Sequence, residues 1–527
     1  MNKLVCKMEI VIFCIIFIQF SCAVYVQTQY GWVRGVRSSD AISFYGIPYA
    51  QQPRRWEHAI HPIPWGGVLN ATKPRPMCIQ PPCGRLDPPG MCQENMSENC
   101  HFVNVFVPLN AGQGNRKTVM VFIHGGDFQS MSGGAPAFNG EHFVNKGDVI
   151  LVTFNYRLGV LGFLVTEGVT GNYGITDQRL VLQWVHSNIE RFGGDRQNVT
   201  LFGQGAGAVS VAIHMTSPKS LGLFRNAILE SLPFSLRLKT VDQARSQGQN
   251  FSSKAGCSDL ECLRKKSPWD ILDAQVKTTL PLGTVLQRLR QWGPHVDGND
   301  VSGDIQAGFR FGRVHDIPLL IGTTTADGAD IVFKTYLEPL NNAAFRTILA
   351  RLNPSHARLW YNLYTPRSND DSRRELTQFI TDFVYTCPTR SFASDMTRIN
   401  NTWVYAFGRN MDFLNGSGMS PHCAISACHG SELAYLFQNI KDLGYNFTMP
   451  DMQLSDEILI YWTNFAKLNN PNGNLDTTDP GMFNWYQYTG RPPVIRAVLG
   501  IGHPQSSIQT DYRGTICNMF DNNNFRA

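Results

Sequence analysis

Five consecutive residues could form a catalytic turn, but the one that should carry the reactive side chain has none. The segment GQGAG (residues 203–207) follows an apolar stretch at residues 199–202 and precedes a helix-like stretch at residues 208–215. In a strand-to-helix turn of the form G-x-S-x-G, a serine is exposed as a nucleophile. Here the serine position is Gly205. Glycine has no side-chain atom that can attack a carbonyl carbon, so we expect no covalent catalysis at this position.

The elements that would position this turn alternate between buried strands and helices. A helix is predicted over residues 180–191, where apolar residues recur at helical spacing and a Gly-Gly pair follows. Near-continuous apolar strands joined by helices predict an α/β fold with a large central, mostly parallel sheet flanked by helices. In such sheets the functional site forms at the carboxyl ends of the strands. The expected strands are residues 119–123, 149–154, 198–202, 227–229 and 318–321.

Composition and charge exclude some classes of function. The 527 residues are 43% hydrophobic and 17% charged, with a formal net charge of +5. These values are typical of a globular chain that is long enough for a large core. We find no Pro- or Ser-rich linker, charge run or internal repeat, and therefore expect one large domain. The positive charge forms no basic arm, so nucleic-acid binding has no support.

The N-terminus has the pattern of a secretory leader. Two lysines precede an apolar run at residues 10–20, and Ser-Cys-Ala follows at residues 21–23. A run this short and so placed favours a cleaved signal peptide over residues 1–23 rather than a membrane span, with an internal buried helix as the alternative. No second long apolar run follows. We therefore expect residues 24–527 to form a secreted, extracellular protein with no membrane span.

Cysteine and asparagine usage agrees with an oxidising compartment. Three of the 13 cysteines lie in the predicted leader, and an even number remains. N-x-S/T sequons are frequent, but Asn198 lies just before the apolar stretch at residues 199–202 and is expected to be a turn residue whose amide is held by hydrogen bonds. The expected glycan acceptors are Asn70, Asn95, Asn250, Asn400, Asn415 and Asn446.

Several segments spread over the chain carry the pattern of one family. They are YGIPYA (residues 45–50), SENC (97–100), NYRLGVLGF (155–163), FGGD (192–195) and YWTNFA (461–466). With these segments the chain resembles the type-B carboxylesterase/cholinesterase family of α/β-hydrolases from about Gly31 to beyond Cys517. Together the segments are very specific, whereas the glycine-rich turn alone is not.

The resemblance implies a serine, an acid and a histidine, in that order along the chain. The segment CHGSEL (residues 428–433) matches the histidine segment of the family, so His429 is the expected base. Asp327 lies at the acid position, where glutamate is usual, and aspartate can orient a histidine as well. Because Gly205 replaces the serine, no competent catalytic group is expected. The two surviving side chains have an alternative explanation as a hydrogen-bonded core pair.

The oxyanion hole implied by the resemblance is also altered. Its backbone donors would be Gly126, Asp127 and Ala206, but the loop reads HGGDF where the family has a third glycine. A carboxylate at Asp127 opposes a developing oxyanion, and loss of one donor costs about 2.7–4 kcal/mol. Gln204 replaces the glutamate that is common beside the nucleophile. Three departures around one site favour loss of catalysis over the alternative that Gly205 is a null allele.

Disulfides and one ion pair also follow from the resemblance. Arg157 and Asp177 match a buried ion pair of the family, and we expect them to be structural. No tryptophan lies between Cys78 and Cys100, so we do not expect choline esters as substrates. No metal and no cofactor are expected. The expected disulfides are Cys78–Cys100, Cys257–Cys262 and Cys387–Cys517, with Cys83–Cys92 and Cys423–Cys428 formed from the remaining cysteines.

Three functions remain open at this point. Relatives with lost triads act as adhesion or signalling ectodomains, which favours a secreted, non-catalytic protein that binds an extracellular partner protein; a homodimer is possible by the same resemblance. A second hypothesis is direct ester hydrolysis, in which Asp127 or His429 activates a water in the space at Gly205, an effect of about 10²–10⁴-fold. The third is a protein that sequesters apolar ligands in the former active-site gorge.

Overall fold

The structure is a computed structural model, and its N-terminal strand begins where the predicted leader ends. Strand β1 starts at Ala23, and the rest of the predicted signal peptide lies outside the described residues. The described residues are 23–83, 90–91, 93, 95–278, 286, 291–352, 354–415, 417, 421–474, 482–489, 496–502 and 505–522.

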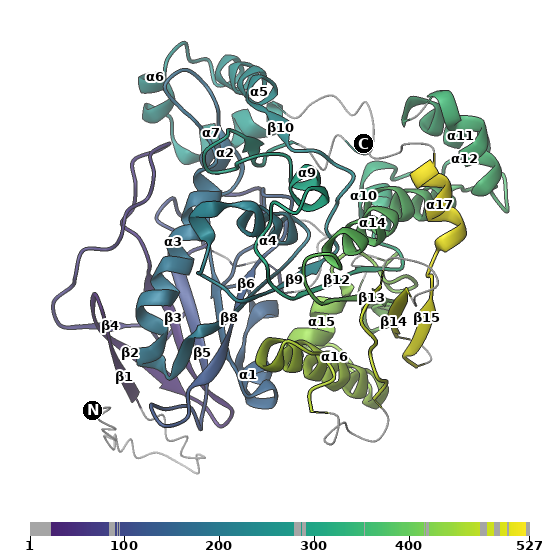
Figure 1. Cartoon of the computed structure of the whole chain (residues 1–527). Coiled ribbons are helices and arrows are strands. Elements are labelled where there is room, and N and C mark those ends of the chain that lie inside the picture. Colours follow the sequence, from purple (N-terminus) through teal and green to yellow (C-terminus); the bar gives the residue numbers. More distant parts are fainter. Residues whose placement is uncertain are drawn as a thin grey trace.

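One sheet of 13 strands crosses the molecule (Figure 1). Its order is β1-β2-β3-β5-β7-β6-β8-β9-β12-β13-β14-β15, with β4 paired to β2. From β7 to β14 in this order, each strand is parallel to the next. At one end of the sheet the successive pairs β1–β2, β2–β3, β3–β5 and β5–β7 are antiparallel, and at the other end β15 is antiparallel to β14. The strands are β1 (Ala23–Thr28), β2 (Gly31–Arg37), β3 (Ala41–Pro48), β4 (Val68–Asn70), β5 (Phe102–Pro108), β6 (Lys117–Ile123), β7 (Ile150–Phe154), β8 (Gly194–Gln204), β9 (Asn226–Glu230), β12 (Leu319–Thr324), β13 (Thr402–Phe407), β14 (Ala497–Ile501) and β15 (Ser507–Thr510), with β10 (Lys239–Thr240) and β11 (His295–Val296) in a separate small sheet.

Helices cover both faces of the central strands. Helices α3 and α4 pack on one face, and α1, α15 and α16 pack on the other (Figure 1). The helices are α1 (Glu141–Gly147), α2 (Gly159–Phe163), α3 (Tyr173–Asn188), α4 (Ala206–Thr216), α5 (Val241–Lys254), α6 (Leu260–Lys265), α7 (Pro268–Lys277), α9 (Ile305–Arg310), α10 (Ala329–Thr335), α11 (Asn342–Leu352), α12 (Ala357–Leu363), α13 (Arg373–Ile380), α14 (Cys387–Met396), α15 (Ser431–Phe437), α16 (Met449–Leu468) and α17 (Gly514–Asn522).

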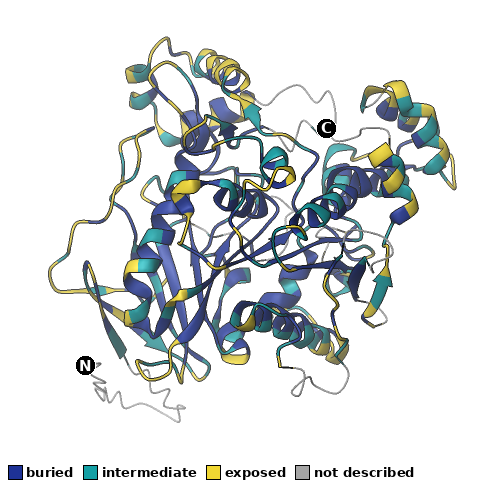
Figure 2. Ribbon diagram, viewed as in Figure 1, coloured by how far each residue is buried: buried dark blue, intermediate teal, exposed yellow. Residues whose placement is uncertain are grey.

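The sequence of β6 shows why this sheet is buried on both faces. Alternate residues of a strand point to opposite faces. Val119 and Val121 belong to the hydrophobic core under α3 and α4, whereas Met120 and Phe122 belong to the core under α16. Every residue of β6 is buried, and most of the length of the central strands is dark blue in Figure 2. A strand with two buried faces is apolar at every position, as the sequence predicts for a parallel sheet.

The predicted α/β-hydrolase architecture is confirmed, with differences at its margins. All five predicted strands are present, and strands from both ends of the described chain share one sheet, as expected of a single domain. The predicted helix at residues 180–191 begins earlier, since α3 starts at Tyr173 and ends in a short 3-10 turn. Strands β1, β2, β3 and β5, which pair antiparallel, were not predicted, nor was β4, which pairs parallel with β2. In the described part of the chain, no helix combines the length and apolar character needed to cross a membrane.

Candidate functional site

The turn between β8 and α4 has a backbone conformation that suits glycine. Gly205 has φ 58° and ψ −115°, a region that residues with a side chain rarely adopt. Its N–H donates to the carbonyl oxygen of Glu230 (2.9 Å), and its carbonyl oxygen accepts from the N–H of Val209 (3.0 Å). A Cβ on Gly207 would overlap the carbonyl oxygen of Ile123. The glycines of the turn are therefore explained by close backbone approach and positive φ.

Asp327 and His429 come from two loops at the carboxyl edge of the sheet and face each other. Asp327 follows β12, and His429 precedes α15. His429 Nδ1 lies 2.8 Å from Asp327 Oδ1. Asp327 Oδ2 accepts hydrogen bonds from the N–H of Thr324 (2.9 Å) and the hydroxyl of Ser231 (3.1 Å). This network fixes the buried carboxylate and orients the imidazole.

The charge of His429 is set by two opposing effects. Burial disfavours the imidazolium, but the hydrogen bond to Asp327 and the negative charges of Asp327, Asp127 and Asp330 outweigh it, so the pKa of His429 is raised above its usual value. A raised pKa leaves less neutral imidazole near pH 7. The side chain is therefore a weaker general base at neutral pH than an unperturbed histidine.

His429 fills the space in which a side chain on Gly205 would begin. An ideal Cβ on Gly205 would lie 2.7 Å from His429 Nε2 and 3.4 Å from Cε1. Real Cβ atoms essentially never approach another heavy atom this closely, so a serine here would require the ring to move. The ring is held on its other side by Asp327 and has 22% of its side chain exposed. The imidazole is oriented, but no hydroxyl of the turn faces it.

The loop after β6 brings backbone donors and a carboxyl group to the same site. Gly126 and Asp127 both have positive φ, at 89° and 54°, and the carbonyl oxygen of Gly126 accepts from the N–H groups of Gln129 and Ser130. Among the residues that the structure describes, the N–H groups of Gly126, Asp127 and Ala206 have no hydrogen-bond acceptor. They are available to an incoming oxygen atom.

The carboxyl group of Asp127 works against those donors. Burial raises the pKa of Asp127, and the negative charge of Asp330 adds to this, while the positive charges of His429 and Lys334 act in the opposite direction. Any ionised fraction of Asp127 places negative charge beside the backbone donors. Such a charge opposes a developing oxyanion.

Three buried polar side chains behind the turn were not predicted as a group. Gln204 Nε2, Glu230 Oε2 and both carboxylate oxygens of Glu432 have no hydrogen-bond partner within the described chain. Burial raises the pKa of both glutamates, and the charge of Glu230 raises that of Glu432 further. The sequence signal was present, because Glu230 ends an apolar strand and Glu432 follows His429 by three residues.

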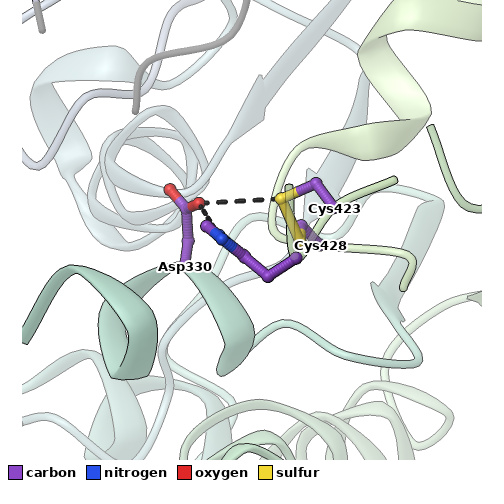
Figure 3. Close-up of side chains that lie close together, drawn as sticks. Asp330, Cys423 and Cys428 are labelled. Atoms are coloured by element: carbon purple, nitrogen blue, oxygen red, sulfur yellow. Dashed lines mark hydrogen bonds and ion pairs between the residues drawn. A yellow bond between two sulfur atoms is a disulfide. The ribbon is translucent and has the colours of Figure 1, made fainter. Parts of the chain in front are cut away.

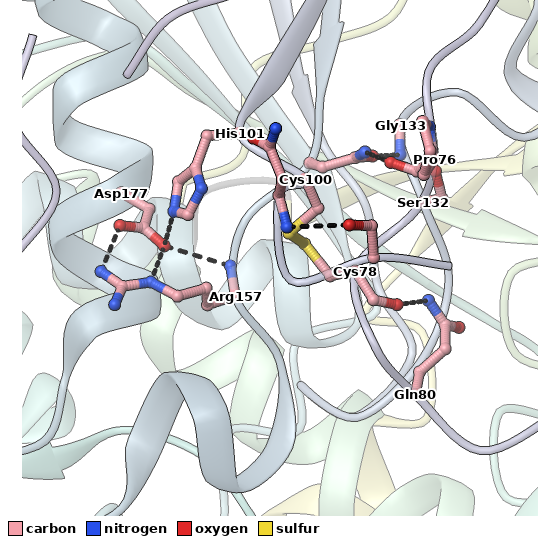
Figure 4. The surroundings of a disulfide bond; sticks show 12 residues. Pro76, Cys78, Gln80, Cys100, His101, Ser132, Gly133, Arg157 and Asp177 are labelled. Carbon is pink, nitrogen blue, oxygen red and sulfur yellow. Dashed lines mark hydrogen bonds and ion pairs between the residues drawn. A yellow bond between two sulfur atoms is a disulfide. The ribbon is translucent and has the colours of Figure 1, made fainter. Parts of the chain in front are cut away.

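A disulfide and a buried ion pair brace the strands beside the site (Figure 4). Cys78 is bonded to Cys100. The next residue, His101, has Nε2 3.3 Å from Asp177 Oδ2, and Arg157 Nη2 lies 2.7 Å from Asp177 Oδ1. Burial opposes the charge of Asp177, but Arg157 and His101 hold its pKa well below the usual range. The predicted ion pair is present, and its place in the core suits a structural role.

Three more of the predicted disulfides are present, and most of the asparagines that were predicted as glycan acceptors are exposed. The disulfides Cys257–Cys262, Cys387–Cys517 and Cys423–Cys428 are present. Cys83 is disulfide-bonded, and its predicted partner, Cys92, lies outside the described residues. Asn198 belongs to strand β8 and not to a turn, although its amide does donate to Thr118 Oγ1 (2.9 Å). The expected glycan acceptors Asn70, Asn95, Asn250, Asn415 and Asn446 are exposed, and Asn400 is half-buried.

Comparison with known proteins places the whole chain in one group. A family model described as "Carboxylesterase family" matches residues 23–520. The chain is 35% identical to the crystal protein of Dictyostelium discoideum, over 93% of this chain and 89% of that one. It is 31% identical to a cholinesterase of Mus musculus, over 93% and 85% of the two chains. The solved structure of a PNB esterase matches with a TM-score of 0.79 and 30% identity, over 94% of this chain and 99% of that one.

Proposed function

The chain belongs to the carboxylesterase family, and from this premise we propose that it is a secreted member without esterase activity that binds an extracellular partner protein. One observation carries the loss of activity. Where the family resemblance expects a nucleophilic serine, Gly205 has no side chain and the His429 ring lies 2.7 Å from the position of the absent Cβ. No acyl-enzyme can form at a residue without a nucleophilic atom.

The oxyanion side of the site supports the same proposal. In an esterase, backbone N–H groups stabilise the negative oxygen of the tetrahedral intermediate. Here Asp127 contributes one of these N–H groups and also a carboxyl group beside them. A substrate that entered the pocket would meet neither an attacking group nor a well-matched oxyanion hole.

The outer surface supports the extracellular part of the proposal. Five of the six expected glycan acceptors are exposed, as is expected of N-x-S/T sequons that are glycosylated on the surface of a secreted protein. Disulfides such as Cys387–Cys517, which join residues 130 apart, persist in oxidising compartments. Family members with lost triads bind partner proteins through the outer surface, and the resemblance implies the same mode of binding for this chain.

A fluorophosphonate probe tests the absence of a nucleophile directly. The probe forms a covalent bond with an activated serine, and the purified wild-type protein should remain unlabelled. Gly205→Ser, which restores a hydroxyl at the turn, is the variant that should become labelled. Ser231→Ala is the control for labelling of the neighbouring hydroxyl, because the Ser231 side chain contacts Asp327. Stoichiometric labelling of any pocket side chain in the wild-type protein would refute the proposal.

The partner-binding half needs a separate readout. Fluorescently labelled protein should bind saturably to cells of the organism that produces it, with an unlabelled excess as competitor. Binding should be unchanged in His429→Ala, because the proposal assigns recognition to the outer surface and not to the pocket. If His429→Ala abolishes binding while the fold is retained, the pocket and not the surface recognises the ligand.

Direct hydrolysis through an activated water is decided by the same variants. His429 is oriented by Asp327 and could act on a water, and this route predicts slow ester turnover in the wild-type protein. That turnover should disappear in His429→Ala. Such a result would replace the non-catalytic proposal. The turnover should still be slow, because general-base assistance alone accelerates a reaction by about 10²–10⁴-fold.

Binding of an apolar ligand is a second candidate because the structure contains a suitable cavity. A cavity of about 320 Å³ is lined by Phe234, Phe383, Phe392 and Phe520 together with charged residues such as Arg237 and Asp304, and neither Gly205 nor His429 lines it. Drug-sized ligands occupy pockets of about this volume. A long-chain fatty ester should then quench tryptophan fluorescence in a saturable way. Phe392→Asp should abolish the effect, and Leu221→Asp, which changes an exposed apolar residue outside the cavity, is the control. No saturable quenching in the wild-type protein would eliminate this candidate.

A further inference from the structure

A second cluster of reactive side chains lies beside the histidine loop (Figure 3). Asp330 belongs to the first turn of α10, and His422, Cys423 and Cys428 belong to the segment before α15. One donor atom from each of the four lies within 4.8 Å of the others. Among the described residues, this is the one such group close enough to share a metal ion.

The four side chains are already directed at one another. Asp330 Oδ1 lies 2.9 Å from His422 Nε2 and 3.7 Å from Cys423 Sγ. Asp330 Oδ2 is held by Lys334 at 2.8 Å, and the His422 ring stacks on Phe333 with centroids 4.8 Å apart. The carboxylate and the imidazole are therefore fixed from behind, which is how supporting contacts orient metal ligands.

The donor set matches one class of metal ion. Two cysteine sulfurs, one imidazole nitrogen and one carboxylate oxygen are ligands of tetrahedral Zn²⁺. In the structure the two sulfurs are joined as the Cys423–Cys428 disulfide, and a disulfide sulfur does not act as a thiolate ligand. The metal and the disulfide therefore exclude each other.

We propose that this cluster has two alternative states, the Cys423–Cys428 disulfide and a Zn²⁺ ion bound by Cys423, Cys428, His422 and Asp330. A thiol reductant converts the first into the second. Two reductant thiols give two electrons and two protons to the disulfide and leave as a disulfide, so that two cysteine thiols form. Zn²⁺ then displaces both thiol protons and forms two Zn–S bonds, with His422 Nε2 and Asp330 Oδ1 as the other ligands.

The geometry and charge of the cluster suit this exchange. Zinc bonds of about 2.0–2.3 Å place tetrahedral donor atoms roughly 3.3–3.8 Å apart. The donors now lie within 4.8 Å, so the sulfurs must separate and the other atoms need shift by only about 1 Å. Two thiolates and one carboxylate exceed the charge of Zn²⁺ by one, and the ammonium of Lys334 beside Asp330 offsets this excess.

Either state would join the two loops that carry the Asp327–His429 pair. Cys428 precedes His429 directly and forms a backbone bridge with Ala326, and Asp330 follows Asp327 by three residues. Zinc would keep these loops together when the disulfide is reduced. The inference does not rest on the proposed partner-binding function, because it concerns only the chemistry of the cluster.

The chain contains its own matched control. The Cys257–Cys262 disulfide has the same sequence separation of 5, yet it belongs to no cluster of metal-ligating side chains among the described residues. Reduction opens both pairs, but only Cys423 and Cys428 gain an imidazole and a carboxylate as neighbouring ligands.

The first experiment maps which thiols zinc protects in the full chain. The native protein is reduced with a phosphine, with and without one equivalent of Zn²⁺, then alkylated with iodoacetamide and analysed by peptide mass spectrometry. Zn²⁺ should suppress alkylation of Cys423 and Cys428, whose thiolates it binds, and leave the alkylation of Cys257 and Cys262 unchanged. Equal labelling of both pairs with and without Zn²⁺ would overturn the proposal, including when reduction unfolds the chain.

The second experiment identifies the ligands with Co²⁺ as a spectroscopic probe. The reduced wild-type protein should bind one Co²⁺ per chain with a thiolate-to-metal charge-transfer band and release about two protons. The band should persist in Cys257→Ser/Cys262→Ser and vanish in Cys423→Ser/Cys428→Ser. His422→Ala should weaken binding by at least about tenfold. A band that survives in Cys423→Ser/Cys428→Ser, or that is unaffected by His422→Ala, would refute the assigned site.

Discussion

Replacing Gly205 by serine restores the missing hydroxyl, and the structure predicts that this has a cost. The new Cβ would lie 2.7 Å from His429 Nε2, whereas ordinary contacts begin at 3.4 Å, so the ring must withdraw by about 0.7 Å. Withdrawal strains the 2.8 Å hydrogen bond to Asp327. The backbone at φ 58° and ψ −115° adds a penalty of about 1–3 kcal/mol for any residue with a side chain. We expect Gly205→Ser to lose at least this much unfolding free energy.

The assay separates the hydroxyl from the strain. Gly205→Ala introduces the same Cβ without a hydroxyl, so both variants should unfold at similarly reduced temperatures in a calorimeter. With a chromogenic short-chain ester, wild type and Gly205→Ala should be inactive and Gly205→Ser weakly active. Gly205→Ser/Asp127→Gly should be faster by about 10²–10³-fold, because one oxyanion-hole interaction is worth that much.

Each step of the Gly205→Ser prediction is refuted by a different result. If Gly205→Ala is as stable as wild type, the argument from the His429 contact and the backbone strain is wrong. If Gly205→Ser is as fast as the double variant, the carboxyl group of Asp127 does not oppose the oxyanion. If the double variant folds and remains inactive, the pocket differs from an esterase in more than these two positions.

Three further perturbations test charge and cross-links by thermal unfolding. Asp127→Asn should raise the melting temperature at pH 7. Burial raises the pKa of Asp127, so ionising this carboxyl group costs stability as the pH rises above its pKa of about 3.9 in the unfolded chain. A gain in melting temperature that persists at pH 3, where the side chain is neutral in both the wild type and the variant, would contradict this. Asp177→Asn leaves Arg157 buried without its ionic partner and should cost about 3–5 kcal/mol, whereas Arg54→Ala in an exposed pair should cost less than about 1 kcal/mol; similar losses would refute the burial argument. Measured without reductant, Cys387→Ser should lose about 5 kcal/mol of unfolding free energy, because the Cys387–Cys517 bond closes a loop of 130 residues. A loss below about 2 kcal/mol would show that removing the bond gives the unfolded chain little additional conformational freedom.

The sequence predicted the centre of the fold better than its edge. Strand β6 is apolar at every position because both of its faces are buried, and such a run is recognisable without a structure. Strand β2 reads GWVRGVR, with buried and exposed residues mixed, and its role depends on pairing with β1 and β3, which no local pattern specifies. The antiparallel strands at the edge of the sheet therefore depend on long-range pairing, which the local sequence does not reveal.

The same limit applies to the site. The positions of Gly205, Asp327 and His429 could be assigned from short motifs, because the family resemblance fixes them in the chain. The close approach of His429 to the turn depends on how its ring packs between Asp327 and Gly205, and no spacing in the sequence encodes that distance. The contact between Ser231 and Asp327 was missed for the same reason, since it joins residues 96 apart.

The survival of Asp327 and His429 without a nucleophile has a structural explanation. Asp327 accepts hydrogen bonds from Thr324 and Ser231 in addition to His429, so its buried carboxylate is satisfied only when the loops after β9 and β12 and before α15 are all in place. Removing His429 leaves one carboxylate oxygen of Asp327 without its partner, and an unsatisfied buried charged group costs more than a typical hydrogen bond contributes. The pair thus joins the loops independently of catalysis. The Cys423–Cys428 disulfide beside Asp330 acts on the same two loops, so the shape of the carboxyl edge of the sheet is held by contacts that require no nucleophile.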